Sequence, residues 1–471
     1  MDTAKILELV ETVNSFLWGP AMLFFLLGTG ILFTFKLRFL QVRKLKTAYK
    51  QIFDKPKNES DEVGMSPFQS LATAIAAQVG TGNLAGVATA IAAGGPGAIF
   101  WMWISGFFGM GTIFAEAVLA QKFNKSEDGE LTGGPAYYIK NGLKSPILAG
   151  FFAISIVLAL GFMGNIVQSN SIAMAVNNAF HIPKLAVGIV VAVLAGLILI
   201  GGVSRIGSFT EKVVPFMAAL YILGALAIVL LNIEQLLPAL KMIVYGAFNP
   251  RAATGGFIGA TVKETLRYGI ARGLFSNEAG MGSTPHAHAV AKVDHPVQQG
   301  LVSILGVIVD TGVVCTLTAL VILTTGAFET GLTGAELTQQ GFFLGFSKLG
   351  NFGNYFVAVS LFFFAFSTII GWYFFGELNI KFLFGKKGIK YYRVIVLLGV
   401  VVGTLLDVEL VWGLADTFNA LMVIPNLIAL VGLSGLVVKI VNDFEDKYEN
   451  KGNGKKGNSG RNNKNYEYKA S

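Results

Sequence analysis

The chain has few of the residues on which soluble enzymes and metal sites depend. Charged residues make up 14% of its 471 positions, against about 25% in a typical soluble domain, which excludes a soluble globular protein. A single cysteine, Cys315, excludes an internal disulfide framework, and four histidines are too few to indicate a metal centre. The sequence contains no HExxH, GxSxG or Walker-type GxxxxGK motif, which argues against a membrane-embedded enzyme and a nucleotide-driven pump.

Apolar residues and glycine are abundant instead. Hydrophobic residues account for 53% of the chain, glycine occurs 57 times, and the mean hydropathy is +0.62. A spanning helix needs about 20 mostly apolar residues. We identify eleven such segments, at 16–37, 66–93, 97–121, 147–178, 184–203, 209–232, 253–291, 296–326, 354–381, 391–408 and 411–440. We therefore predict an all-α polytopic protein of the cell (plasma) membrane with eleven transmembrane helices, in contact with the lipid bilayer.

The distribution of lysine and arginine predicts the orientation of the chain, because cytoplasmic loops carry an excess of both. Three parts of the chain are basic: the loop after the first segment, the loop between the ninth and tenth segments, and the carboxyl-terminal tail. The loop at 327–353, by contrast, has a single basic residue, Lys348. We expect the amino terminus outside and the carboxyl terminus in the cytoplasm. The net charge of +8 then belongs to the cytoplasmic face and does not indicate nucleic acid. This orientation requires the segment at 253–291 to span, although its first half is polar.

Two segments are interrupted by glycine and polar residues at mid-span, AAQVGTGNLAG at 76–86 and GLFSNEAGMGSTP at 273–285. Backbone outside a helix is tolerated at this depth where it lines a cavity, and a pair of broken helices indicates an inverted-repeat transporter. Each broken segment opens a block of five, which predicts an inverted five-plus-five repeat at 66–232 and 253–440. An extra helix and basic loop (1–65) precede it, and a disordered cytoplasmic tail (441–471) follows. The alternative is that the glycines only permit close helix packing.

The ends of broken helices present free N–H groups to an anion and free carbonyls to a cation, which suits a zwitterion such as an amino acid. Asn165 and Gln168 lie on one face of the fourth segment, where they either face the pocket or bond between helices. In the first break we expect four residues to contact the substrate carboxylate, namely Gln78, Thr81, Gly82 and Asn83. In the second break we expect substrate contacts from Gly273, Phe275 and Ser276.

The second broken segment, followed by HAH, closely resembles the signature of the alanine or glycine:cation symporter family, also called sodium:alanine symporters. The resemblance covers roughly residues 15–440 and includes AAQVGTGNLAGVATAIAAGGPGAIFWMW at 76–103, GGPAYYI at 133–139, GNIVQSNSIA at 164–173, VVPFMAALYIL at 213–223, DHPVQQG at 294–300 and IPNLIAL at 424–430. It implies a leucine-transporter-type fold and the uptake of alanine and glycine with Na⁺ or sometimes H⁺.

The resemblance also implies a Na⁺ site between the second and ninth segments. Carried over to this sequence, its ligands are the carbonyls of Ala76, Val79 and Phe364 and the hydroxyls of Ser367 and Thr368. Five neutral oxygens suit a hard monovalent cation, with no carboxylate to favour Ca²⁺. Trp372, four residues after Thr368, is placed to cap the pocket and to exclude long side chains.

The intramembrane carboxylates Glu116 and Glu278 either carry a proton or pair with Arg272 in a structural role. His286 stands where the family often has an apolar residue; we expect a solvated or packing role, with pH sensitivity as the alternative. The sequence thus predicts a secondary symporter for small neutral amino acids that uses Na⁺ as its coupling ion, with no cofactor and no obligate protein partner. Alternatives are H⁺ coupling, another small zwitterion or an organic cation.

Overall fold

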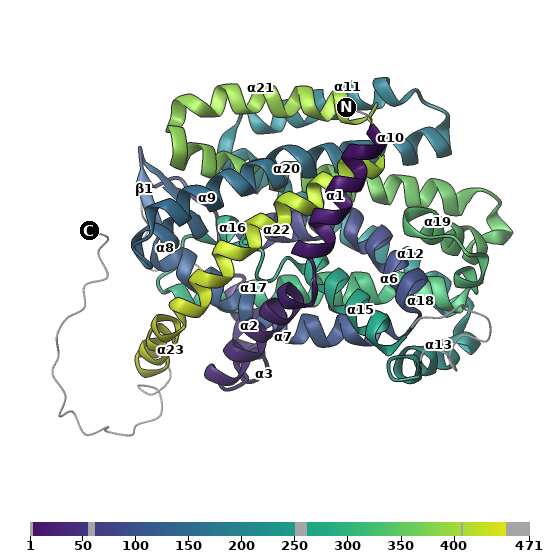
Figure 1. The fold of residues 1–471 in the computed structure, drawn as a ribbon, viewed down its shortest axis with the longest axis horizontal. Coiled ribbons are helices and arrows are strands. Elements are labelled where there is room, and N and C mark those ends of the chain that lie inside the picture. The colour runs from purple at the N-terminus through teal and green to yellow at the C-terminus, as the bar shows by residue number, and fades with distance from the viewer. Residues whose placement is uncertain (1–2, 55–61, 250–260, 407, 449–471) are drawn as a thin grey trace.

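A computed structural model describes residues 3–54, 62–249, 261–406 and 408–448. This part of the chain is almost entirely helical, with one antiparallel hairpin of β1 (Lys125–Glu127) and β2 (Glu130–Thr132). Helices from both halves of the sequence interleave around one apolar core (Figure 1).

The helices of the first half are α1 (Thr3–Leu17), α2 (Pro20–Lys36), α3 (Leu40–Arg43), α4 (Leu45–Gln51), α5 (Pro67–Gln78), η1 (Gly82–Gly86), α6 (Val87–Gly94), α7 (Ala98–Lys122), α8 (Pro135–Asn141), α9 (Pro146–Ile156), η2 (Val157–Gly164), α10 (Asn165–Phe180), α11 (Lys184–Leu199), α12 (Gly202–Leu231) and α13 (Ile233–Gly246). Those of the second half are α15 (Val262–Asn277), α16 (Pro285–Ala289), α17 (Pro296–Val307), η3 (Ile308–Cys315), α18 (Thr316–Thr324), η4 (Ala327–Thr330), α19 (Gly334–Gly345), η5 (Ser347–Leu349), α20 (Phe352–Phe384), α21 (Lys386–Gly403), α22 (Val408–Gly432) and α23 (Ser434–Tyr448).

Six helical segments of the described chain are long and apolar enough to cross a membrane, and two bent helix pairs raise the number to eight. The bent pairs are α1 with α2 and α5 with η1–α6. The shorter α11, the basic start of α21 and the polar α15 explain why three expected segments do not meet the same criterion. The count of eleven therefore stays a prediction.

The carboxyl-terminal boundary differs from the expectation. The apolar helix α22 ends at Gly432, and the amphipathic helix α23 continues to Tyr448, so the expected disorder over 441–471 is wrong for residues 441–448. α23 is held against the rest of the chain by an ion pair of Lys44 with Glu445 (3.6 Å) and a contact of His295 with Asp443 (3.2 Å). Residues 449–471, like residues 253–260 of the expected seventh segment, lie outside the described residues.

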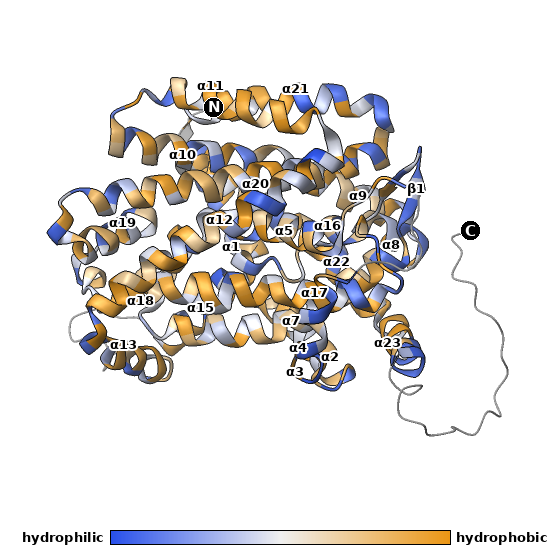
Figure 2. Ribbon diagram, turned by 180° about the vertical axis from the view of Figure 1, so that it is seen from behind, coloured by the Kyte–Doolittle hydropathy of each residue, from blue (hydrophilic) through white to orange (hydrophobic). Residues whose placement is uncertain are grey.

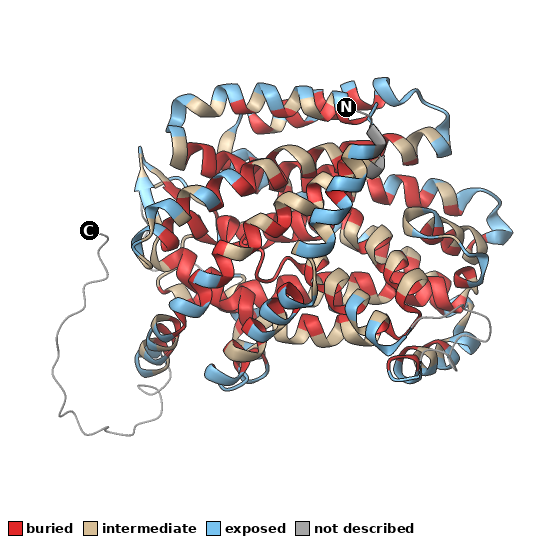
Figure 3. Cartoon of the chain, viewed as in Figure 1, coloured by how far each residue is buried: buried red, intermediate tan, exposed pale blue. Residues whose placement is uncertain are grey.

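The helices at the centre of the molecule are buried, and those at its edge have exposed apolar faces. α5, α7, α17 and α20 are largely buried at the centre (Figure 3). α11 and α21 lie side by side along one edge (Figure 1) and are strongly apolar over much of their length (Figure 2). Their exposed residues include Ile189, Val193, Leu197, Leu398 and Val402. An exposed apolar face of this kind suits contact with lipid.

Elements far apart in the sequence gather at the two ends of the molecule. The hairpin, α8 and α23 lie toward one end, and α13 and α19 lie at the other (Figure 1). The first group comes from the segments predicted to be cytoplasmic and the second from those predicted to be outside. The two breaks lie between these ends.

Candidate functional site

The first broken helix begins and ends as its sequence suggests. Ser66 accepts a hydrogen bond from the Gln69 amide and the Gln69 side chain accepts one from the Ser66 amide, which completes a capping box ahead of Pro67. α5 ends at Gln78, and the chain resumes as a helix at Gly82 with a bend of 52°. The interruption at mid-segment is confirmed.

The second break is longer. α15 ends at Asn277, and Glu278, Gly280 and Gly282 follow with φ angles of 58°, 86° and 80°. Left-handed backbone of this kind is accessible mainly to glycine. α16 then begins at Pro285, so this segment is also interrupted where the sequence predicts it.

The two breaks lie against each other. The Gln78 side chain donates a hydrogen bond to the Asn277 carbonyl at 2.6 Å, so it joins the ends of the two half-helices. A methyl group at Gly82 would approach Phe275 and Ser276 to 3.9 Å, which places these predicted residues face to face. Gly273, by contrast, packs against Ser105 of α7, so close helix packing accounts for this glycine.

The five predicted cation ligands converge. The Thr368 hydroxyl lies 2.9 Å from the Ala76 carbonyl, 3.0 Å from the Phe364 carbonyl and 3.5 Å from the Val79 carbonyl. The Ser367 hydroxyl lies 2.9 Å from the Phe364 carbonyl and 3.5 Å from the Ala76 carbonyl. Both hydroxyls are buried. The end of α5 and the middle of α20 therefore supply a compact group of neutral oxygens that suits Na⁺.

Gln168 and Asn165 contribute polar atoms beside this group. The Gln168 side chain donates to the Thr81 hydroxyl at 3.1 Å, and the Asn165 side chain donates to the Gly161 carbonyl of its own helix at 3.0 Å. The side-chain oxygens of both residues are buried and accept no hydrogen bond within the described chain. Buried acceptors without a donor are costly, so these two are open to a ligand that brings its own donors, such as an ammonium group.

Trp372 links α20 to the second break. Its indole N–H donates to Glu278 at 2.8 Å, and Ser283 donates to the other carboxylate oxygen. Its ring fills the space beside Gly164, where a methyl group would approach it to 2.6 Å. The alternative in which Glu278 pairs with Arg272 is wrong, because the partners of Glu278 are these two donors.

Asp310 is a site residue that the sequence reasoning missed. It lies buried in η3, where Oδ1 accepts hydrogen bonds from Asn83 at 2.5 Å and Ser276 at 3.0 Å, and Oδ2 accepts one from Thr311 at 2.7 Å. Asn83 and Ser276, both expected to contact substrate, therefore point toward this carboxylate from the two breaks. An acid in the apolar run ILGVIVDTGVVC was the available signal.

Glu116 fixes the second break from α7. Its carboxylate accepts hydrogen bonds from the Gly280 amide at 3.1 Å, the Gly282 amide at 3.0 Å and the Asn426 side chain at 2.6 Å. Asn426, on α22, in turn accepts a hydrogen bond from Tyr138 of α8. The expected alternative of a pair with Arg272 is wrong here as well. Glu116 holds three donors, so it shapes the loop between α15 and α16.

We predict that Gly282→Ala disrupts this loop. The added methyl group would approach Phe152 to 2.8 Å and Asn426 to 3.0 Å at a φ of 80°. Left-handed strain and overpacking together should lower the free energy of unfolding by about 2 kcal/mol or more. Thermal unfolding in detergent measures the loss. Gly150→Ala, in open space on helix α9, is the matched control and should melt at or slightly above the temperature of the parent, because alanine favours a helix more than glycine does; equal melting temperatures for both variants would contradict the prediction.

His286 is a packing residue rather than a solvated one. It is buried, stacks on Phe152 and Phe375 at 6.1 and 5.6 Å, and lies 2.7 Å from the Ser283 carbonyl through Nδ1. Asn379 donates to its Nε2 at 2.8 Å. With Nδ1–H donating and Nε2 accepting, the neutral ring satisfies both contacts.

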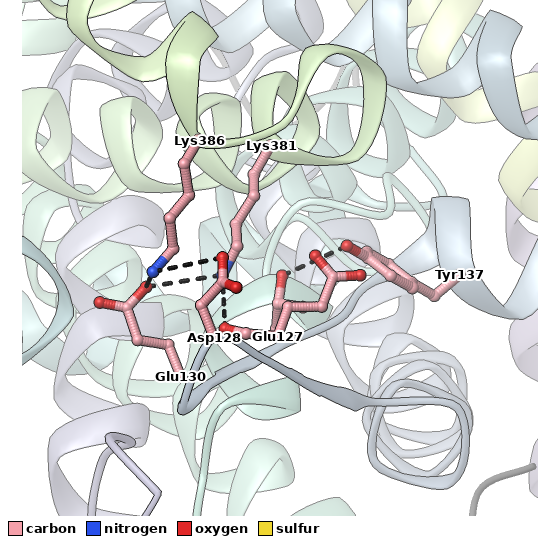
Figure 4. A network of polar contacts seen from close by, with 7 residues as sticks. Glu127, Asp128, Glu130, Tyr137, Lys381 and Lys386 are labelled. Carbon is pink, nitrogen blue, oxygen red and sulfur yellow. Dashed lines mark hydrogen bonds and ion pairs between the residues drawn. The ribbon is translucent and has the colours of Figure 1, made fainter.

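A cavity and an ion-pair network lie on opposite sides of the breaks. The cavity has a volume of about 360 Å³, is lined by Gly82, Phe275 and Asp416 among others, and extends to α19. On the other side, Figure 4 shows the hairpin meeting the start of α21, where Lys386 lies 3.5 Å from Asp128. Lys381 and Lys386 also lie 3.5 and 3.7 Å from Glu130. The breaks are therefore approached by a cavity from the α19 side.

Comparisons with known proteins show which family of proteins this chain is similar to. A model of the family described as the sodium:alanine symporter family matches residues 3–458. The chain is 47% identical to the sodium/alanine symporter AgcS of Methanococcus maripaludis, covering 94% of this chain and 98% of that protein. It is 44% identical to the probable sodium/glutamine symporter GlnT of Bacillus subtilis, covering 93% and 91%.

Two solved structures show the fold. A manganese transporter of Eremococcus coleocola matches with a TM-score of 0.54 at 14% identity, covering 82% of this chain and 89% of that one. MhsT in complex with L-phenylalanine matches with a TM-score of 0.55 at 13% identity, covering 81% and 99%. The described helices thus adopt a membrane-transporter fold of the leucine-transporter type.

Proposed function

The chain belongs to the sodium:alanine symporter family, a family of transporters rather than enzymes, and we propose that it takes up alanine and glycine together with Na⁺ by alternating access. The observation that carries the proposal is the convergence of three backbone carbonyl oxygens on the hydroxyls of Thr368 and Ser367, beside two adjoining breaks. We further propose the inverted five-plus-five repeat with one extra amino-terminal helix. Two broken helices, each at the start of a half, support that arrangement.

The proposed substrate position lies between the breaks. The amides of Thr81 and Gly82, at the start of a half-helix, face the carboxylate. The unpaired oxygen of Gln168, whose side chain bonds to Thr81, accepts from the ammonium group, together with that of Asn165 on the same helix face. Phe275 and Trp372 bound the substrate side chain. Asn83 acts through the backbone instead, since its side chain is committed to Asp310. The Gln78 side-chain nitrogen donates to Asn277, and its side-chain oxygen stays open to the ligand.

The proposed cation site lies at the contact of α5 with α20. Na⁺ bound there holds the end of the first half-helix against α20, so its binding favours one arrangement of these two elements over another. A ligand shifts such an equilibrium only by its difference in affinity for the two states. Substrate and Na⁺ both depend on the backbone at residues 79–82, which supports coupling between them.

Proton coupling is the second candidate, and Asp310 favours it. This buried carboxylate joins both breaks through Asn83 and Ser276, so protonating it would change the hydrogen bonds at the junction. Proteoliposomes with an imposed pH gradient, and no Na⁺, separate this candidate from the first.

The proposed orientation places α13 and α19 outside and the hairpin, α8 and α23 in the cytoplasm. The cavity on the α19 side then makes the described state outward-facing. We predict that single cysteines at Thr333→Cys and Lys50→Cys, in a Cys315→Ser background, react with an impermeant maleimide from opposite sides. Both positions are exposed. Labelling of both from outside whole cells would contradict the orientation.

We predict that the pocket accepts only small side chains. Extra methylenes against a packed wall cost about 1–3 kcal/mol, so unlabelled alanine and glycine should displace bound alanine, valine poorly and leucine hardly at all. Trp372→Leu should shift the competition toward larger amino acids. Trp372→Phe is the control, because it loses the bond to Glu278 and keeps most of the ring. Leucine competing as well as alanine in the parent would refute the small pocket.

A further inference from the structure

A second, larger cavity lies outside the region between the breaks. It is an open cavity between α1, α15 and α22 with a volume of about 730 Å³, which is within the size range of small-molecule sites. Arg272, Phe275 and Asp416 line both this cavity and the smaller one that reaches Gly82. These three residues therefore stand between an outlying cavity and the proposed substrate route.

The extra helix α1 forms one wall of this cavity with a polar face. Glu11, Asn14, Ser15 and Trp18 line it, at a spacing that keeps them on one side of the helix. Polar contacts fasten that face to α22: Asn14 donates to the Gly413 carbonyl at 2.8 Å, and Trp18 donates to the Asp416 carbonyl at 2.9 Å.

The charges around the cavity balance in number, and the charge of Arg272 acts on Asp416 although the two side chains are not in direct contact. Glu11 and Asp416 supply two carboxylates, and Arg267 and Arg272 supply two guanidinium groups. Among the residues that the structure describes, none of these four makes an ion pair with another. Arg267 is exposed and lies over the Tyr268 ring at 5.7 Å, which keeps its guanidinium at the cavity wall.

We propose that this cavity is a second binding site for an α-amino acid of the transported class. The Arg267 guanidinium of α15 binds the carboxylate, for which its planar donors are suited. Glu11 of α1 binds the ammonium group. An amino acid held there is separated from the proposed substrate route only by Arg272, Phe275 and Asp416, which line both cavities. The inference rests on the proposed function, because it takes the transported amino acid as its ligand.

Equilibrium binding of radiolabelled alanine to the purified full chain in nanodiscs, at saturating Na⁺, tests the proposal. We expect two alanines per chain in the parent. Arg267→Gln and Glu11→Gln should each weaken the second site by roughly ten-fold or more and leave the affinity of the central site within about two-fold. Lys263→Gln, an exposed charge on the same helix outside the cavity, is the matched control and should keep both sites.

Competition distinguishes a zwitterion site from a simple anion site. Propionate and ethylamine each carry one of the two charged groups of alanine, and each should displace the second alanine far less well than alanine itself. One alanine per chain in the parent, two unchanged sites in both charge variants, or displacement by propionate alone would overturn the proposal. Binding of no alanine at all would contradict the proposed function first, and a single site that Thr368→Val weakens would contradict only the second site.

Discussion

Replacing Thr368 by valine should abolish concentrative uptake of alanine. The substitution keeps the volume of the side chain and removes the hydroxyl that lies within 3.5 Å of three backbone carbonyls. A contact to a charged group is worth about 1.5–3 kcal/mol, so the Na⁺ affinity should fall by roughly ten- to a hundred-fold. Alanine uptake as a function of Na⁺ concentration in proteoliposomes measures the change.

A control variant separates the loss of a cation ligand from the general effect of replacing a buried threonine by valine. Thr324 is also buried, and within the part of the chain that the structure describes its hydroxyl bonds only to the Leu320 carbonyl of its own helix, so Thr324→Val should leave the Na⁺ dependence unchanged. Equal Na⁺ affinity in the parent and Thr368→Val would show that these oxygens are not the cation site, whatever drives transport.

Asp310→Asn should have an effect of similar size on transport. The amide would present an N–H group to at least one of the donors from Asn83, Ser276 and Thr311, which leaves a buried donor unpaired. We expect uptake to fall by roughly ten- to a hundred-fold. If Asp310 carries a proton, the residual uptake should also lose its dependence on external pH.

Cys315→Ser serves as the control for Asp310→Asn. Cys315 lies 3.3 Å from both the Asn83 and the Ser276 side chains, so the substitution changes the same surroundings and leaves the carboxylate in place. Its transport should be close to that of the parent. Wild-type transport rates and an unchanged pH profile in Asp310→Asn would show that this carboxylate has no role in transport.

The sequence predicts the interrupted helices well because their causes are local. Glycine at positive φ, a proline at the first turn and a capping box can each be recognised within a few residues, as at Gly280, Pro285 and Ser66. The convergence of Ala76 with Thr368 depends on contacts across 292 positions, and only the family resemblance could supply it. Neither source determines which way a polar side chain turns.

The residues whose side-chain partners could not be predicted show this limit. Asn83 faces Asp310, and Glu116 faces the Gly280 and Gly282 amides. An intramembrane acid must find donors, but those donors can be backbone groups of a loop that the sequence shows only as glycine. Arg272 is the natural partner by charge, yet it lies at the wall between two cavities.

The most direct test of the central claim is the uptake of radiolabelled alanine into proteoliposomes that contain the purified chain. With an inward Na⁺ gradient and no pH gradient, alanine should accumulate above its external concentration, and an ionophore that dissipates the Na⁺ gradient should release it. Accumulation driven equally by a proton gradient in the absence of Na⁺, or no accumulation of alanine or glycine under either gradient, would contradict Na⁺-coupled symport of small neutral amino acids.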